Sequence, residues 1–344
     1  MPRRGVLGGL RPPTQCTLIL TEGDSAKASA VAGLSVVGRQ KYGVFPLRGK
    51  VMNVCDVGAD KVAANAEITA IKKILGLQTG KAYASVADLR YGRVMLMTDA
   101  DTDGSHIKGL VMNLFQLQWP SLLRVEGFMC TLLTPIVKAF LSSSGAKSKG
   151  GAAAPLEFYN LGEYRRWSES HAAAEVAGTG TGKKPTLKYY KGLGTSTAEE
   201  ARDWFRKMKM TVYVWEEDGG RSKEALGLAF DKKRADDRKA WLAAYEPDRA
   251  SLSAAASLGK THTDVTYTEF VNDELIEFSN YDVLRSIPSA IDGLKVSQRK
   301  ALFGCRKRNL VKGELRVAQL AAYVAEHACF HHGEASMQVG GYAP

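Results

Sequence analysis

Three aspartates at alternate positions constrain this 344-residue sequence more than any other feature. The hexapeptide Asp99-Ala-Asp101-Thr-Asp103-Gly104 follows residues 94–98, an apolar run that predicts a buried strand, and apolar residues at helical spacing come after it. Carboxylates this close repel one another strongly in a low-dielectric cleft. A divalent cation would neutralise them, so the pattern indicates a metal site; the alternative is a solvated acidic turn that caps the next helix.

The same hexapeptide begins an EF-hand calcium loop, but the rest of that loop does not follow. An EF-hand requires Glu at its twelfth position, where this chain has Leu110, and a helix before the loop, where residues 94–98 predict a strand. The acidic hexapeptide contains neither Cys nor His, and a ligand set of oxygens alone favours Mg²⁺ over zinc.

Glu22 occupies the same kind of position in a second strand–loop–helix unit. Residues 16–20 form a short β-rich run, residues 21–25 break it, and residues 26–34 are helix-permissive. Two such units with acids after the strand predict an α/β domain with a partly parallel sheet. If the two strands are neighbours, Glu22 meets the aspartates and can act as metal ligand or general acid/base. Taken alone, a glutamate near a helix start is ordinarily a surface residue.

The charge balance favours a polyanionic partner. Lys and Arg number 47 against 36 Asp and Glu, which gives a formal net charge of +11. Nucleic acid is the first expectation and an anionic membrane surface the second. No apolar run approaches the roughly 20 residues of a membrane span, which excludes an integral membrane protein. The five cysteines form no CxxC pair, which argues against a zinc ribbon or a disulfide scaffold.

Three basic segments are candidates for phosphate contacts. Arg48-Gly49-Lys50 and Lys191-Gly-Leu-Gly194 place cations beside glycines that allow close approach of the backbone to a phosphate. Taken alone, each would be an ordinary surface turn. Lys295 and Arg299 stand four residues apart on one predicted helix face, next to Lys300, and the alternative there is a solvated basic helix.

The combination of motifs resembles a known family. Glu22-Gly-Asp-Ser-Ala26 together with the acidic hexapeptide resembles the two signatures of a Toprim domain. The motifs that resemble eukaryotic type IIA DNA topoisomerases, in the family's order, are Pro46-Leu-Arg-Gly-Lys50, Ile107-Lys-Gly-Leu110, Tyr190-Lys-Gly-Leu-Gly-Thr-Ser196, Ile287-Pro-Ser-Ala-Ile-Asp-Gly-Leu294 and His331-His-Gly-Glu334. The resemblance implies a Rossmann-like Toprim domain with a partly parallel sheet, followed by a mainly α-helical winged-helix segment.

The resemblance also implies roles for individual residues. Carried over by position, Asp99 and Asp101 are the principal Mg²⁺ ligands, and Asp103 supports the cluster. Glu22 shares a metal and serves the DNA 3′-hydroxyl as general acid/base. The residues that the resemblance places near DNA are Arg48, Lys50, Lys191, Lys295, Arg299 and Lys300.

The function implied is that of the Mg²⁺-dependent cleavage and religation region of an ATP-dependent, homodimeric type II topoisomerase. In that family a tyrosine attacks double-stranded DNA, a second duplex passes through the gate, and the break is resealed. ATP would be bound by a domain absent from this chain. The eukaryotic resemblance favours the nucleus, with the mitochondrion as the alternative, and no membrane partner is expected.

The sequence also departs from the family pattern. Val296-Ser297 stands where the family commonly has Pro-Gly. The family's nucleophilic tyrosine follows an arginine well downstream of the His-His-Gly-Glu motif; here Arg90-Tyr91 lies in the wrong domain, and no arginine precedes Tyr342. We therefore expect a fragment that binds Mg²⁺ and DNA but is inactive alone. The alternatives are a Toprim-type metal-dependent nuclease and a non-enzymatic, truncated DNA-binding protein.

Composition and motifs together predict six segments. They are a leader (1–15), a Toprim core (16–141), a linker-like insertion with a short ordered element at 156–167 (142–185), a Toprim-associated extension that is helical from 198 to 245 (186–250), a partial winged-helix domain (264–337) and a divergent tail (338–344). His327, His331 and His332 are interpreted as structural or DNA-proximal residues, because adjacent histidines on a regular helix cannot both face one metal.

Overall fold

A computed structural model describes residues 15–141, 155–176, 185–190, 192–217, 220–246, 262–311, 313–330 and 334–340 of the chain. The chain divides into two compact units, Met1–Ile276 and Glu277–Pro344. Nearly all of the predicted leader and most of the predicted tail lie outside the described residues.

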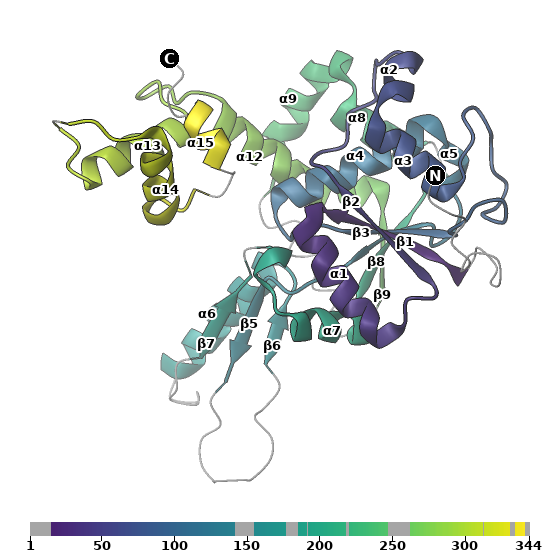
Figure 1. Ribbon diagram of the computed structural model, residues 1–344, viewed down its shortest axis with the longest axis horizontal. Helices are drawn as coiled ribbons and strands as arrows, with labels where there is room; N and C mark the ends of the chain where they lie inside the picture. The colour runs from purple at the N-terminus through teal and green to yellow at the C-terminus, as the bar shows by residue number, and fades with distance from the viewer. Residues whose placement is uncertain are drawn as a thin grey trace, which may run out of the picture. The chain divides into compact units, whose positions relative to one another are not determined.

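A six-stranded sheet forms the centre of the first unit (Figure 1). Its strands, in spatial order, are β2 (Tyr42–Leu47), β1 (Thr17–Glu22), β3 (Arg93–Met97), β4 (Met129–Leu132), β8 (Met210–Val214) and β9 (His262–Thr266). β1 pairs in parallel with β2 and β3, β3 with β4, and β8 with β9, whereas β4 and β8 are antiparallel. The predicted α/β class with a partly parallel sheet is therefore confirmed.

Helices cover both faces of this sheet (Figure 1). On one side lie α1 (Gly23–Val37) and α7 (Ala198–Lys207), and on the other α3 (Ala66–Leu75), α4 (Thr102–Gln118) and α8 (Arg221–Phe230). Ile19 and Met95 belong to the core that α1 and α7 cover. The neighbouring Leu18 and Leu96 are also buried and point to the opposite face, because side chains alternate along a strand.

Several short elements complete the first unit. They are α2 (Ala59–Ala64), α5 (Pro120–Leu123), a 3₁₀ turn η2 (Leu193–Thr195), a 3₁₀ turn η3 (Lys232–Arg234), α9 (Ala235–Ala243), α11 (Tyr267–Glu269) and a π-type segment η4 (Phe270–Leu275). α12 (Ile276–Ser286) begins at the boundary between the two units.

The prediction of a continuous helical stretch from 198 to 245 was wrong. The stretch contains strand β8, which pairs with β4 and β9 inside the sheet. Met-Thr-Val-Tyr-Val is rich in β-branched and aromatic residues, and Val212 and Tyr213 are buried there. The charged residues that suggested a long helix lie on the flanking helices α7, α8 and α9.

The first unit also contains a second, three-stranded sheet. Its strands, in spatial order, are β6 (Leu156–Phe158), β5 (Val137–Phe140) and β7 (Thr186–Tyr189), all antiparallel. α6 (Leu161–Val176) contributes Tyr164 and Trp167 to the small core of this sheet, next to Phe158. The linker-like segment 142–185 thus contains a strand and a helix, and the ordered element expected at 156–167 lies within β6 and the first part of α6. Residues 142–154 and 177–184 lie outside the described residues.

In the second unit the described residues are mainly helical. The helices are α12, except for its first residue, followed by α13 (Val296–Lys307), α14 (Val317–His327) and α15 (Glu334–Gly340). Ala301, Leu320, Val324, Phe330 and Met337 form their common core. Over the described parts of both units, no helix is long and apolar enough to cross a membrane.

Gly33 provides a test of the packing between α1 and α7. A Cβ at this position would overlap the ring of Phe205, which is fully buried. Gly33→Ala should therefore lower the free energy of unfolding by about 1–3 kcal/mol, although alanine is the better helix former by ~1 kcal/mol. Urea unfolding followed by circular dichroism measures the change. Gly227→Ala in α8 is the matched control, because Gly227 also lies inside a helix and a Cβ there meets only Arg234 Nη1, at 4.0 Å. Equal stability of both variants would contradict this packing.

Candidate metal and nucleic-acid site

Glu22 and Asp99 meet at the carboxyl ends of two neighbouring strands. β1 and β3 are parallel and in register, with Thr21 opposite Met97, so the residues that follow them emerge side by side. The backbone N–H of Asp99 donates a hydrogen bond of 3.1 Å to Glu22 Oε2. The parallel register thus places one carboxylate directly beside the start of the acidic loop.

The turn η2 holds the Asp99 side chain from the other direction. The backbone N–H of Leu193 donates to Asp99 Oδ1 at 2.8 Å, and the Leu193 carbonyl accepts from Ser29 Oγ at 3.2 Å. Gly192 adopts an extended conformation against the same carboxylate, and a Cβ at this position would overlap Asp99 Oδ2. The Asp99 carboxylate is therefore fixed on one side by the backbone of this turn.

The other two aspartates have different partners. Asp101 is the N-cap of α4, where its Oδ1 accepts a 2.7 Å hydrogen bond from the N–H of Gly104. Asp103 lies in the first turn of α4, and its Oδ1 is 2.6 Å from Lys50 Nζ. Lys50 Nζ also lies 3.0 Å from His106 Nδ1. Each aspartate of the alternating motif therefore has a separate structural role.

The electrostatics of the cluster disfavour its fully ionised form. Burial raises the pKa of Glu22 from 4.5 to about 7, the charges of Asp99, Asp101 and Asp103 add to the rise, and the Asp99 N–H opposes it. The pKa of Asp99 is also raised, first by burial and further by Asp101, against the effect of the Leu193 N–H. A bound cation would offset this repulsion, since it neutralises charge that the protein leaves uncompensated.

The carboxylate oxygens of the cluster suit a divalent cation such as Mg²⁺, but the side chains are not yet close enough together to form a complete site. Glu22, Asp99 and Asp101 offer only oxygen ligands, which such cations prefer. Within the described parts of the chain, no group of three or more acidic, histidine or cysteine side chains is already assembled as a metal site. Glu22 and Asp99 form the core of the candidate site. Asp101 stands next along the loop, and Asp103 is engaged by Lys50.

The predicted DNA-binding residues of the first unit differ in their surroundings. Arg48 is exposed, and its backbone N–H donates to Glu67 Oε1. Lys50 is bound to Asp103, as described, and so lies at the edge of the acidic loop. Lys191 lies outside the described residues.

The basic residues of the second unit have partners within that unit. Lys295 is the N-cap of α13 and not part of the helix, so it does not share a regular helical face with Arg299 as the spacing suggested. Arg299 makes a two-pronged ion pair with Asp292, at 3.0 and 2.9 Å. Lys300 Nζ donates to the Cys329 carbonyl at 2.9 Å.

Of the histidines His327, His331 and His332, only His327 lies within the described residues. Its ring stacks on Tyr323 with centroids 4.0 Å apart, and its Nδ1 lies 3.1 Å from the Tyr323 carbonyl. His331 and His332 fall outside the described residues.

Sequence reasoning missed the residues that orient Asp99. The sequence indicates only a basic turn near phosphate at Gly192 and Leu193, and no pattern in it singles out Ser29. Leu193 is separated from Asp99 by 94 positions, so no local pattern connects them. The one available signal was the Gly-Leu-Gly sequence, which marks a place where the backbone approaches another group closely.

Comparison with protein families defines the class of this chain. Residues 17–130 match the Toprim domain, and residues 132–283 match the C-terminal associated domain of Toprim. Residues 285–340 match the A-type subunit of DNA gyrase/topoisomerase IV. The first unit therefore matches a Toprim domain and its associated domain, and the second unit matches a segment of a type II topoisomerase subunit.

Individual proteins show which topoisomerases the chain resembles. The chain is 46% identical over 329 residues to DNA topoisomerase 2 of Saccharomyces cerevisiae and 50% identical over 339 residues to human DNA topoisomerase 2-alpha. Each match covers 96% of this chain and 21% of the relative. The crystal structure of the Plasmodium falciparum topoisomerase II DNA-binding, cleavage and re-ligation domain matches with a TM-score of 0.75 and 44% identity, over 95% of this chain and 41% of that chain.

Over nearly its whole length the chain is similar to part of the eukaryotic type II DNA topoisomerases, and the solved structure that it matches is a DNA-binding, cleavage and re-ligation domain. The resemblance found in the sequence is thereby confirmed. The chain spans about a fifth of the length of the curated relatives it matches.

Glu22→Gln should stabilise the folded chain at alkaline pH when metal is chelated. Because the pKa of Glu22 rises from 4.5 to about 7 on folding, the wild type loses stability as pH rises from 4.5 through 7. Glutamine keeps an oxygen for the Asp99 N–H but carries no charge. Urea unfolding in EDTA should show a gain of about 1–3 kcal/mol at pH 8 that disappears near pH 4.5.

The matched control for this experiment is Asp24→Asn, which removes an exposed carboxylate from the first turn of α1. It should show no comparable gain at pH 8. A Glu22→Gln variant no more stable than the wild type at pH 8 would show that the carboxylate is not destabilised by its surroundings.

Proposed function

We propose that this chain supplies the Mg²⁺-dependent DNA cleavage and religation site of an ATP-dependent, homodimeric type II topoisomerase. The observation that carries the proposal is the meeting of Glu22 and Asp99 at the ends of two parallel strands. The ATP requirement, the homodimer and a nuclear location, with the mitochondrion as alternative, rest on the family resemblance.

Three carboxylates would hold the ion in this proposal. Glu22, Asp99 and Asp101 are the ligands, and bound Mg²⁺ would stabilise negative charge that develops on phosphate oxygens during cleavage and religation. Hydrogen bonds from Leu193 and Gly104 orient Asp99 and Asp101. These two side chains are therefore oriented before the ion binds, so that binding costs little further conformational entropy.

Glu22 is suited to move a proton in the same site. In the metal-free chain the pKa of this carboxyl group is about 7, and a bound cation would lower it towards the range of an ionised general base. Its proposed partner is the 3′-oxygen of the cleaved strand, to which it gives a proton on cleavage and from which it takes one on religation.

DNA binding in this proposal depends on cations around the acidic loop and on the second unit. The net charge of +11 provides the general attraction. Arg48, Lys50 and Lys191 are proposed to contact the backbone near the cleaved bond. Lys295, Arg299 and Lys300 are proposed to contact it from the second unit.

Asp99→Asn combined with Asp101→Asn should abolish Mg²⁺ binding to the 344-residue chain, measured by titration calorimetry. Asparagine removes the charge that attracts the ion but keeps an N-cap oxygen for α4. The control is Asp236→Asn, an exposed carboxylate in the first turn of α9, which should bind Mg²⁺ like the wild type.

Retained Mg²⁺ binding in the double variant would contradict the assignment of the metal site. Mg²⁺-dependent nicking of plasmid DNA by the wild-type chain would instead favour the metal-dependent nuclease. DNA binding by a wild-type chain that binds no Mg²⁺ would favour a non-enzymatic DNA-binding protein.

Arg48→Ala should reduce the salt dependence of duplex DNA binding. Each phosphate contact that is lost lowers the slope of log K against log salt by about 0.9. Fluorescence anisotropy of a labelled duplex over a series of KCl concentrations measures this slope. Lys81→Ala is the matched control, because Lys81 is paired with Asp88 and is not among the proposed DNA contacts. A slope unchanged by Arg48→Ala would remove this residue from the proposed interface.

A further inference from the structure

The turn η2 contacts both Asp99 and the helix that follows Glu22. The Leu193 N–H donates to Asp99 Oδ1 at 2.8 Å, and the Leu193 carbonyl accepts from Ser29 of α1, the helix that follows Glu22. Leu193 itself is buried in the core between α1, α7 and the sheet. Whatever fixes the position of this turn therefore also fixes the direction of the Asp99 carboxylate.

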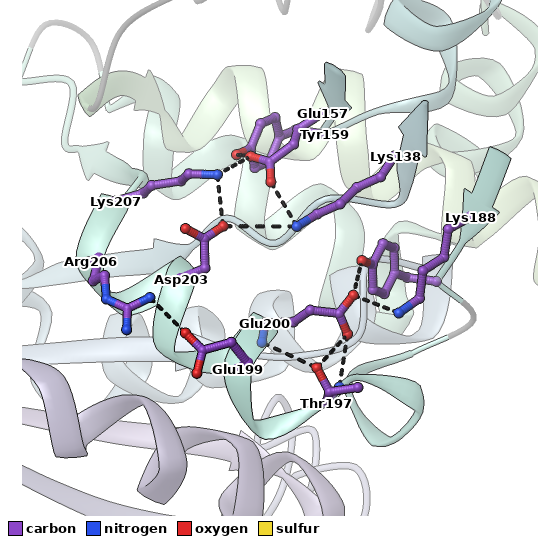
Figure 2. A network of polar contacts seen from close by, with 11 residues as sticks. Lys138, Glu157, Tyr159, Lys188, Thr197, Glu199, Glu200, Asp203, Arg206 and Lys207 are labelled. Carbon is purple, nitrogen blue, oxygen red and sulfur yellow. Dashed lines mark hydrogen bonds and ion pairs between the residues drawn. The ribbon is translucent and has the colours of Figure 1, made fainter. Parts of the chain in front are cut away.

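One carboxylate, that of Glu200 in α7, binds the chain on both sides of the turn (Figure 2). Before the turn, Lys188 Nζ and the hydroxyl of Tyr190 donate to Glu200 Oε1, the lysine at 2.5 Å. After the turn, the Thr197 N–H and Oγ1 donate to Glu200 Oε2, at 2.8 and 3.1 Å. Glu200 thus ties β7 and the segment after the turn to one point at the start of α7.

The charge state of this contact is well defined. Burial alone would raise the pKa of Glu200, but Lys188, Tyr190 and the Thr197 N–H together lower it to about 2. The pKa of Tyr190 is raised, by burial and by its hydrogen bond to Glu200. At neutral pH the carboxylate accepts and the phenol donates, so the contact is a charge-assisted hydrogen bond.

The neighbouring Glu199 shows that this arrangement is particular to Glu200. Glu199 points away from the turn and pairs with Arg206 (Figure 2). Its other partner, Arg202, also lies on α7. A further group of ion pairs, around Glu157, joins Lys138 of β5 to Lys207 of α7. These contacts hold the three-stranded sheet against α7 and do not reach η2.

We infer that Glu200 is a positioning residue for the metal site. It holds the two ends of the η2 segment, so that the Leu193 N–H keeps the Asp99 carboxylate in its observed position. The inference rests on the proposed function in one respect, because it matters to metal binding only if Asp99 is a ligand. Glu200 touches no substrate or reacting atom; it acts through Tyr190, Thr197 and the backbone of the turn.

The first arm of the test needs no metal. Glu200→Gln in the 344-residue chain keeps a side chain that can complete the capping box with Thr197, so α7 should still form. Hydrogen exchange of the Leu193 amide should become about 3- to 10-fold faster, because the turn opens more often. Glu199→Gln removes an equal charge one position away and should leave this exchange unchanged. Equal exchange in both variants would overturn the inference.

The second arm measures Mg²⁺ binding by titration calorimetry. Glu200→Gln should weaken Mg²⁺ binding about 3- to 10-fold, whereas Glu199→Gln should not. Tyr190→Phe, which keeps the ring but removes the hydroxyl, should shift binding in the same direction. In an Asp99→Asn background, Glu200→Gln should cause no further loss, since its effect passes through Asp99.

The outcomes separate the inference from the proposed function. A wild-type chain that binds no Mg²⁺ overturns both. A wild-type chain that binds Mg²⁺ while Glu200→Gln and Glu199→Gln bind it equally well overturns the positioning role and leaves the proposed function standing. A further loss from Glu200→Gln in the Asp99→Asn background would show a general structural effect and also overturn the inference.

Discussion

The burial of several carboxylates close to one another is the constraint around which the rest of the site is arranged. β1 and β3 end side by side, so Glu22 and Asp99 meet where burial raises the pKa of both. Backbone N–H groups hold Asp99 and Asp101, and Lys50 holds Asp103. Each of these partners offsets part of the repulsion. The part that remains is available to attract a cation, which is the physical basis of the proposed metal site.

The three-stranded sheet and α7 matter to this site although neither contributes a carboxylate to the cluster. β7 leads into the turn that holds Asp99, and α7 begins directly after that turn. Glu157 of this sheet, whose side chain is 10% exposed, is paired with Lys207 of α7 at 2.9 Å. A buried ion pair adds little stability but penalises any other docking, because separating the partners leaves a desolvated charge. The site is therefore aligned by polar contacts outside it.

The sequence was sufficient to predict those features of the fold and of the site that depend on local patterns of residues. Two strand–loop–helix units with terminal acids predicted both the parallel strands and the proximity of Glu22 to the aspartates. Strand β8 was missed because its five residues lie between strongly charged helices, and charge density is a weak guide to secondary structure. The hydrogen bond from Leu193 to Asp99 and the pairing of Lys50 with Asp103 join distant positions. Such contacts depend on the packing of the whole unit and leave no periodic signal.

The basic residues also form contacts that the composition of the chain does not predict. Net charge predicts a polyanionic partner but does not identify the cations that meet it. Lys50, Arg299 and Lys300 all have partners within the protein, so a phosphate must share or replace those contacts, and the net gain is smaller than that of an unengaged cation. At Lys50 this competition involves the acidic loop itself. A phosphate that draws Lys50 away removes one positive charge from beside Asp103, which strengthens the local field for a divalent cation.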